Sequence, residues 1–163
     1  MAKNRRVHRD DKALVNHWLQ HIGRQTRVGL ALDHDGVCTI GHDSGLDCCV
    51  EVPDNGSVYL RVALLPWEPE ENPDLAERCL LASFMGIGTG GAAFGVDPLD
   101  AELVLWQERP LSCLNEASFA ALVVQILENA VRLRNDLAEA EYEANREVLS
   151  QLRSPTNFSM LKV

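Results

Sequence analysis

The sequence predicts a single small α/β (α+β) domain in which three helices are combined with a mostly antiparallel sheet of about five strands. Its 163 residues are enough to bury one core, and 46% of them are hydrophobic. Segments with helical apolar spacing and segments with alternating apolar spacing follow one another in the order α-β-β-β-α-β-β-α. We expect this domain over residues 12–152, between a flexible basic N-terminus (1–11) and a flexible tail (153–163).

The first helix is predicted by apolar residues that recur with helical spacing after a polar start. Asp10 or Asp11 can cap its N-terminus, and the pattern continues to about Ile22. The apolar stripe of this helix consists of Leu14, Val15, Trp18, Leu19 and Ile22.

Three strands follow the first helix. The motif LDHDG (32–36) indicates a turn, and a first strand begins at Val37. Residues 46–52 and 57–65 alternate between apolar and other residues on either side of the turn motif PDNG (53–56). This pattern is typical of a β-hairpin.

The second helix is predicted from an N-cap at Asn72, with Pro73 at the first helical position, to about Met85. Its second half, Cys79–Met85, is apolar almost all round, whereas a helix on the surface of a small monomer should have a polar face. We therefore expect this helix to be covered on two sides, by the sheet and by a second subunit.

The glycine-rich motif FMGIGTGGAAFG (84–95) raises the question of a phosphate-binding loop. Such a loop needs a strand, then glycines, then a helix whose N-terminus faces the phosphate. Here a helix precedes the glycines and a strand (92–96) follows them, and no Lys-Ser or Lys-Thr pair comes after the last glycine. The glycines are therefore interpreted as architectural: they end the helix with positive φ and allow close backbone approach.

A last strand and a long final helix complete the pattern. The strand is predicted over 101–108, and Asn115 caps a helix that runs from Glu116 to about Leu152. Beyond Leu133 the sequence becomes strongly charged, so we expect that part to be exposed. The apolar stripe of the helix consists of Phe119, Leu122, Val123, Ile126, Leu127, Ala130 and Val131.

Charge excludes some classes of partner. The net charge is −9 with a pI near 4.9, which argues against nucleic acid and anionic membranes as partners. Residues 1–12 carry a net charge of +3, but no apolar segment of the kind found in signal peptides follows them. We expect a soluble cytosolic protein.

No motif for catalysis, metal binding or a cofactor emerges. The five cysteines have neither disulfide-framework nor zinc-site spacing, and the vicinal pair Cys48–Cys49 is interpreted as packing residues. His17 and His21 are four residues apart but have no obvious third ligand, so we expect a solvated pair. The DHDG motif lacks the other ligands of a calcium loop. We predict no catalytic, cofactor or metal site, and no enzyme.

The pattern of elements in an acidic chain of this length resembles the class I type III secretion chaperones, the Tir chaperone family. The resemblance covers about residues 12–135 and is carried by VGLALDHDGVCTI, by GTGGAAFGVDPLDAELVLWQERPL and by the final helix. Residues 90–98 are similar to the family pattern G-G-A-x-x-G-x-D-P. The basic start and the extension after Leu133 depart from the family.

The resemblance implies a homodimer in the bacterial cytosol that binds the N-terminal segment of a secreted effector, keeps it secretion-competent and does not hydrolyse ATP. It also implies the secretion ATPase or sorting components as further partners. In the family, the second helix and the strand after the glycines form the dimer interface. Here they supply Cys79, Leu80, Ser83, Phe84, Ala92, Ala93 and Phe94.

For the effector we hypothesise strand addition at the sheet edge, beside a groove lined by the first helix. One helix cannot bury its whole apolar stripe on one sheet face, and tryptophan is enriched at binding hot spots. The alternative is that Trp18 is a core residue. The predicted lining consists of Leu14, Trp18, Leu19, Ile22, Val37, Tyr59 and Trp106.

Two alternative functions stay open at this point. One is a stress or regulatory binding module of the same fold outside secretion. The other is a small-molecule enzyme that uses the glycine-rich loop, which a thermal shift with nucleotides would reveal.

Overall fold

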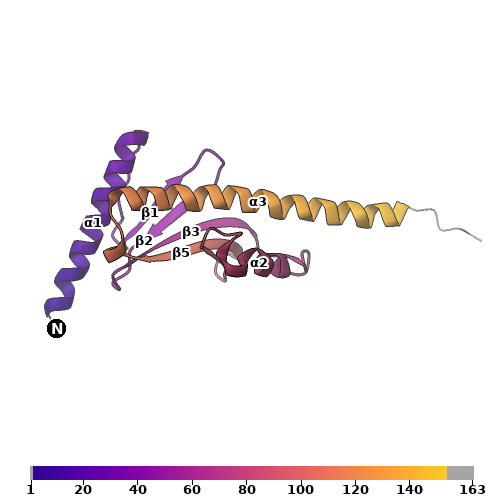
Figure 1. Cartoon of the computed structure of the whole chain (residues 1–163), viewed down its shortest axis with the longest axis horizontal. Helices are drawn as coiled ribbons and strands as arrows, with labels where there is room; N and C mark the ends of the chain where they lie inside the picture. The colour runs from indigo at the N-terminus through magenta and orange to yellow at the C-terminus, as the bar shows by residue number, and fades with distance from the viewer. Residues whose placement is uncertain (1, 154–163) are drawn as a thin grey trace, which may run out of the picture.

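The computed structural model describes residues 2–153 and the side chains of residues 11–139. The predicted order of helices and strands is confirmed (Figure 1). The elements are α1 (Ala2–Thr26), β1 (Val37–Gly41), β2 (Asp47–Glu51), β3 (Ser57–Pro66), α2 (Leu75–Ser83), η1 (Phe84–Gly86), β4 (Ala93–Asp97), β5 (Glu102–Pro110), η2 (Leu111–Cys113) and α3 (Glu116–Arg153). None of the helices within the described range is long and apolar enough to cross a membrane.

The five strands form one antiparallel sheet in the order β1-β2-β3-β5-β4. The predicted hairpin between β2 and β3 is present, and its turn is fixed by Gly56 at φ 79° and by the Asn55 side chain, whose oxygen accepts the Ser57 N–H at 3.0 Å. Strands β1 and β4 are the two edges of the sheet.

Helix α3 lies along one face of the sheet, and α1 crosses the first part of α3 at one end of the molecule (Figure 1). The core between these elements combines the inward residues of β3 (Val58, Leu60, Val62) with the buried stripe of α3 that includes Phe119 and Ile126. Because every second strand residue points the other way, Tyr59 and Arg61 lie on the face opposite α3.

Helix α1 begins earlier than predicted. Residues 2–11, expected to be flexible, are helical as its first turns. The physical reason is that residues 2–11 contain neither Pro nor Gly and several good helix formers. At the other end the helix closes at Thr26, and the following Arg27 adopts a positive φ of 60°. The predicted tail from residue 154 lies outside the described residues.

Helix α2 is shorter than predicted at both ends. It begins at Leu75 without a side-chain cap, because the carboxamide oxygen of Asn72 accepts a hydrogen bond from Arg78 at 3.1 Å instead. It ends at Ser83, because Met85 adopts the left-handed conformation at φ 53° within η1. The predicted cap at Asn72 and the predicted end at Met85 were therefore wrong.

Helix α3 begins as predicted. The Asn115 side chain accepts the Ser118 N–H at 2.9 Å, and the Ser118 hydroxyl accepts the Asn115 N–H at 2.8 Å. Burial extends one turn beyond the predicted limit at Leu133, since Leu137 is only 6% exposed. The reason is α2, whose Arg78 donates to the Leu137 carbonyl oxygen at 3.4 Å.

Candidate functional site

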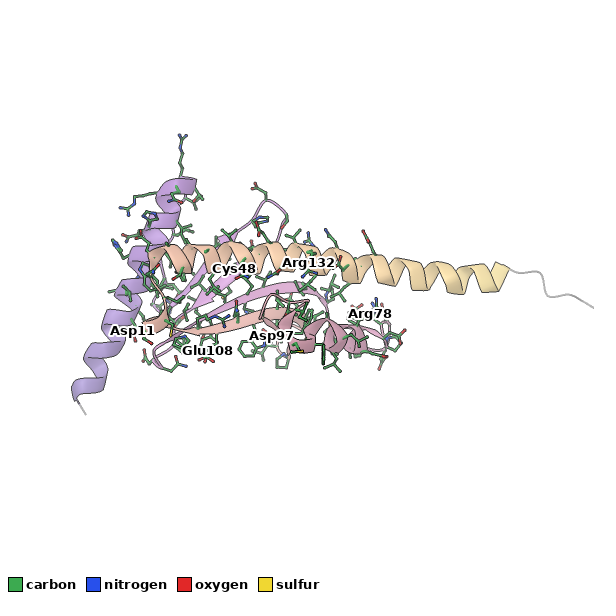
Figure 2. The ribbon with its side chains drawn as sticks, viewed as in Figure 1. Asp11, Cys48, Arg78, Asp97, Glu108 and Arg132 are labelled. Atoms are coloured by element: carbon green, nitrogen blue, oxygen red, sulfur yellow. The ribbon has the colours of Figure 1, made fainter. Side chains whose placement is uncertain are left out.

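The glycine-rich loop between α2 and β4 is held by side chains from α3 and β5. Arg132 of α3 donates a hydrogen bond to the Gly88 carbonyl oxygen, and Gln107 of β5 donates to the Gly91 carbonyl oxygen at 3.2 Å. The buried Thr89 hydroxyl donates to the Ala92 carbonyl oxygen at 2.6 Å. Figure 2 labels Arg132 on α3. The loop is thus fastened to the domain by its carbonyl groups.

Close packing and backbone conformation both require glycine in this loop. Gly86, Gly90 and Gly91 have φ values of 68°, 63° and 84°. A Cβ atom at Gly90 would lie 2.2 Å from Nδ2 of Asn129 on α3, and one at Gly88 would lie 2.4 Å from the Ala82 carbonyl oxygen. These contacts confirm the interpretation of the glycines as architectural.

The fastened loop and α2 present an apolar patch to solvent, which we call the α2 patch. Leu75 and Cys79 face inward from α2, while Leu80 is 74% and Met85 80% exposed. Large exposed apolar patches on a small domain mark interaction sites. The α2 patch consists of Leu80, Leu81, Phe84, Met85 and Ile87.

The residues predicted for the dimer interface differ in their exposure in the structure. Leu80, Phe84 and Ala93 are exposed, whereas Ser83 and Phe94 are half-buried. Cys79 and Ala92 are buried within the chain and support the surface from below. Leu81 and Met85 lie in the apolar run Cys79–Met85 that predicted cover by a second subunit, although they were not among the predicted interface residues. Sequence reasoning missed Ile87 and Leu99, although the apolar residues between the glycines and in the turn DPLD were a usable signal.

A second apolar surface lies between α1 and the segment that follows it. The carboxamide oxygen of Asn16 accepts the Leu32 N–H at 2.7 Å, and a Cβ atom at Gly23 would lie 2.3 Å from the Val28 carbonyl oxygen. The segment after α1 therefore runs back close along the helix, and an open groove of about 500 Å³ lies between the two, which we call the α1 groove. Its lining consists of Gln20, Gly23, Arg24, Val28, Gly29, Leu30 and Ala31.

The predicted effector-binding residues of α1 lie at different depths. Trp18 is 4% exposed, with its ring centroid 5.4 Å from that of Phe119, and Leu19 is fully buried. Both are core residues in this conformation. Leu14 is exposed and Ile22 half-buried, so these two retain accessible surface on α1.

The other predicted binding residues share the sheet face opposite α3. Val37 pairs with Glu51, and Glu51 with Tyr59, so these side chains form one row across the face. The Tyr59 ring stacks on Trp106 with centroids 6.4 Å apart. The structure thus brings Val37, Tyr59 and Trp106 together on this open face, while Trp18 and Leu19 belong to the core on the other face.

The open face also carries an ion pair. Arg61 of β3 contacts the carboxylate of Asp97 at the end of β4. The backbone N–H of Leu99 donates to that carboxylate at 2.9 Å and, with Arg61, holds the pKa of Asp97 below its ordinary value. Figure 2 shows Asp97 beside the end of the sheet that lies next to α2.

Three buried cysteines and the half-buried Cys49 are not poised for nucleophilic chemistry. Burial raises the pKa of the Cys48 thiol to about 12, and burial also raises the pKa values of Cys38, Cys49 and Cys79. Since the thiolate is the reactive form, these four thiols are protonated at neutral pH.

The two histidines of α1 are not simply solvated. The carboxylate of Glu116, in the first turn of α3, lies 3.5 Å from His17 Nε2 and 3.1 Å from His21 Nδ1. These contacts tie α1 to α3, and sequence reasoning missed Glu116 because the two helices are far apart in the chain. The DHDG motif forms the predicted turn, in which the Asp33 carboxylate accepts the N–H groups of Asp35 and Val37 at 2.9 and 3.0 Å.

Comparison with known structures agrees with this architecture. The chain is similar to a chain of the ExsC–ExsE complex, with a TM-score of 0.68 and 16% identity over 77% of this chain and 95% of that one. It is also similar to a chain of the ExoU–SpcU complex from the type III secretion system of Pseudomonas aeruginosa. Here the TM-score is 0.58, and the identity is 17% over 74% of this chain and 95% of that one. A third similar structure is the complex of the Yersinia pestis type III secretion chaperone SycH with a fragment of YscM2. Its TM-score is 0.55, and the identity is 11% over 72% of this chain and 98% of that one.

At these identities the structural matches establish the fold. A search of curated proteins finds no match. The Tir chaperone protein (CesT) family, in contrast, matches residues 17–134, which is more than half of the chain. That range includes the α1 groove, the whole sheet and the α2 patch. The chain therefore belongs to the Tir chaperone protein (CesT) family.

Proposed function

We propose that this protein is a chaperone of the bacterial cytosol that binds the N-terminal segment of a type III secreted effector and keeps it competent for secretion. The observation that carries the proposal is the family match over residues 17–134 together with an apolar groove beside an open sheet edge. In one of the similar structures, a type III secretion chaperone is in complex with a fragment of a second protein. In this proposal, the effector segment takes the place that the fragment of the second protein has in that complex.

The effector segment is proposed to add a strand at β1. In the described part of the chain, β1 pairs only with β2. Its outer edge therefore offers backbone N–H and C=O groups to an extended peptide. At the start of that edge, the Asp33 N–H already binds the Val37 carbonyl oxygen at 2.8 Å, so the added strand pairs along Cys38–Gly41.

Apolar side chains of the effector are proposed to anchor in the α1 groove and on the open face. Val28 in the groove is 54% exposed, and Leu14 is exposed on α1. The stacked Tyr59 and Trp106 offer a flat apolar surface of the kind that is enriched at binding hot spots. The role of Trp18 and Leu19 is to hold α1 in place beneath this surface.

The protein is proposed to act as a homodimer joined through the α2 patch and the outer edge of β4. Five large exposed apolar side chains meet there, and fastening of the loop by Arg132 and Gln107 limits the entropy that they would lose on binding. A two-fold interface uses the same patch on both subunits. The two edges of the sheet then serve two different partners: β4 a second copy and β1 the effector.

We propose that binding, without catalysis or a bound cofactor, is the whole activity of the domain, and that the secretion ATPase or sorting components receive the loaded complex. The carbonyl groups of the glycine-rich loop are used within the domain, which supports this view. Addition of nucleotides is expected to leave the melting temperature unchanged, whereas a ligand at a hundred times its Kd stabilises by about 2.7 kcal/mol.

The test of the proposed function is capture of an effector by its N-terminal segment. The tagged protein is used as bait in a secretion-competent bacterium, and captured proteins are identified by mass spectrometry. A captured effector is then produced with and without its N-terminal segment and is assayed for binding and for secretion. Equal binding of both forms, or unchanged secretion when the chaperone gene is deleted, would overturn the proposal.

A further inference from the structure

Both ends of the described chain extend beyond the family fold. The family match spans residues 17–134, and the three structures compared above cover 95–98% of their own chains with only 72–77% of this one. The additional parts are the first turns of α1 and the last turns of α3. We call residues 2–12 the α1 extension and residues 138–153 the α3 extension.

The α3 extension projects past the domain. Leu137 is the last residue of α3 with a buried side chain in the part whose side chains are described. The C-terminal part of α3 runs past the sheet and past α2 (Figure 1). Its sixteen residues span about 24 Å. Most helical stability in proteins comes from packing of one helix face, so contact with a partner would stabilise this part of α3.

The sequence of the α3 extension continues the apolar spacing of the buried stripe. Ala130, Leu133 and Leu137 are buried on the domain side of α3. The series continues at intervals of four residues with Ala140, Ala144, Val148 and Leu152. A helix that leaves a domain with an apolar series still in register is suited to packing against another helix.

The two extensions are opposite in charge. Residues 1–12 carry a net charge of +3, with Lys3, Arg5, Arg6, Arg9 and Lys12 against two aspartates. The α3 extension, by contrast, has a net charge of −2, and its first half, residues 138–145, contains Glu139, Glu141 and Glu143 and neither Lys nor Arg. Such complementarity steers association and fixes the partner.

The two extensions of one chain cannot meet. The start of α1 lies at one end of the long axis of the molecule, and the tip of α3 lies at the other end (Figure 1). The domain between them is spanned by Glu116–Leu137 of α3, about 32 Å of helix. The complementary partner of each extension is therefore found on another molecule.

From these observations we propose that the acidic α3 extension of one copy packs against the basic α1 extension of a second copy of the same chain. In a two-fold dimer this contact forms twice. The inference rests on the proposed homodimer, to which it adds a second, charge-dependent contact away from the α2 patch. It assigns a role to the two parts of the sequence that the family fold does not use.

The chain offers a specific test because it contains three lysines, Lys3, Lys12 and Lys162. A zero-length carbodiimide reagent joins lysine amines to carboxylates. Equal amounts of ¹⁴N-labelled and ¹⁵N-labelled protein are mixed, equilibrated and cross-linked, and the linked peptides are identified by mass spectrometry. We expect Lys3 to be joined to Glu139, Glu141 or Glu143 in peptides that combine both isotopes. Lys3→Arg keeps the charge and should abolish these products.

Charge reversal tests whether the opposite charges of the two extensions stabilise the contact between them. Arg5→Glu/Arg6→Glu/Arg9→Glu should raise the dissociation constant of the dimer, measured by sedimentation, about tenfold, and Glu139→Arg/Glu141→Arg/Glu143→Arg should do the same. The combination of both sets should restore most of the affinity; sedimentation is the measurement here because the second set removes the carboxylates that the cross-linking reagent needs. A matched control, Glu68→Arg/Glu70→Arg/Glu71→Arg, makes the same charge change in an exposed loop and should have no effect.

Sedimentation of the same samples separates this inference from the proposed function. If the protein is a dimer but Lys3 forms no mixed-isotope products, or if charge reversal leaves the dissociation constant of the dimer unchanged, the extension contact is wrong and the homodimer stands. If the unmodified protein is a monomer, the proposed homodimer and the extension contact both fail. Effector binding, measured with the captured effector, reports on the chaperone function independently of either result.

Discussion

The indole ring of Trp18 packs on the phenyl ring of Phe119 with their centroids 5.4 Å apart, and this contact joins α1 to the first turn of α3. The carboxylate of Glu116 lies beside His17 and His21 at the same junction. Helix α1, which lines the proposed effector groove, is therefore positioned by the start of the final helix.

Trp18→Ala is expected to lower the free energy of unfolding by about 3 kcal/mol or more, because a large buried ring is removed and a cavity is left. Trp18→Phe should recover much of this loss, since it keeps an aromatic partner for Phe119. Urea denaturation followed by circular dichroism measures both. An Ala variant with an unchanged midpoint would show that the Trp18–Phe119 contact does not hold α1.

Val28→Asp is expected to reduce effector binding at least tenfold with little change in stability, because the charge is placed in an apolar groove but on an exposed side chain. Val124→Asp is the matched control, since Val124 is equally exposed on α3 and does not line the groove. Calorimetric titration with the captured effector gives both affinities. Equal affinities of the two variants would exclude the α1 groove as the binding site.

Leu80→Asp is expected to convert the dimer into a folded monomer. Leu80 is exposed within one chain, so a charge there does not disturb folding, but in the dimer it would be buried without a partner. Val124→Asp again serves as the control and should remain a dimer. Light scattering at micromolar concentration distinguishes the two. A Leu80→Asp variant that stays dimeric would exclude the α2 patch as the interface.

Gly90→Ala is expected to destabilise the protein by roughly 2 kcal/mol or more, since the backbone is left-handed there and the new Cβ would meet the Asn129 side chain at 2.2 Å. Gly45→Ala carries a similar φ of 77° but meets nothing within 4 Å, so it measures backbone strain alone. The melting temperature of Gly90→Ala is compared with that of Gly45→Ala, and the difference measures the cost of the contact between the new Cβ atom and Asn129 of α3. Equal losses would mean that Asn129 moves aside at no cost.

Asp97 is expected to contribute stability that is lost at acidic pH. Its pKa in the folded protein is lowered, chiefly by the Leu99 N–H and further by Arg61, below the ordinary value of 3.8. A lowered folded pKa means that the contribution is complete above that ordinary value and disappears as the pH falls through the folded pKa. The stability difference between the unmodified protein and Asp97→Asn should therefore shrink below about pH 4. A constant difference between pH 7 and pH 3, measured by urea denaturation, would contradict this.

The order of the elements was accessible from the sequence because each depends on local chemistry. Alternating apolar residues around the turn at Gly56 predicted the β2–β3 hairpin, and Asn115 predicted the start of α3. The glycine-rich loop could be assigned an architectural role from the order of its neighbours alone. Helix ends were predicted less well, because Asn72 is bound by Arg78 from within α2 and Met85 takes a left-handed conformation that a pattern of apolar residues does not reveal.

Which apolar residues face a partner was decided only by the tertiary structure. The sequence of α1 places Leu14, Trp18 and Leu19 on one apolar stripe, yet Phe119 from the start of α3 covers Trp18 and leaves Leu14 exposed. In the same way, Cys79 and Leu80 are neighbours in an apolar run, but the direction in which α2 meets the core buries the first and exposes the second. The periodicity of the sequence determines that a helix has an apolar stripe. Packing between distant segments determines how much of that stripe stays exposed to solvent, because burial depends on which other elements the fold places against that face.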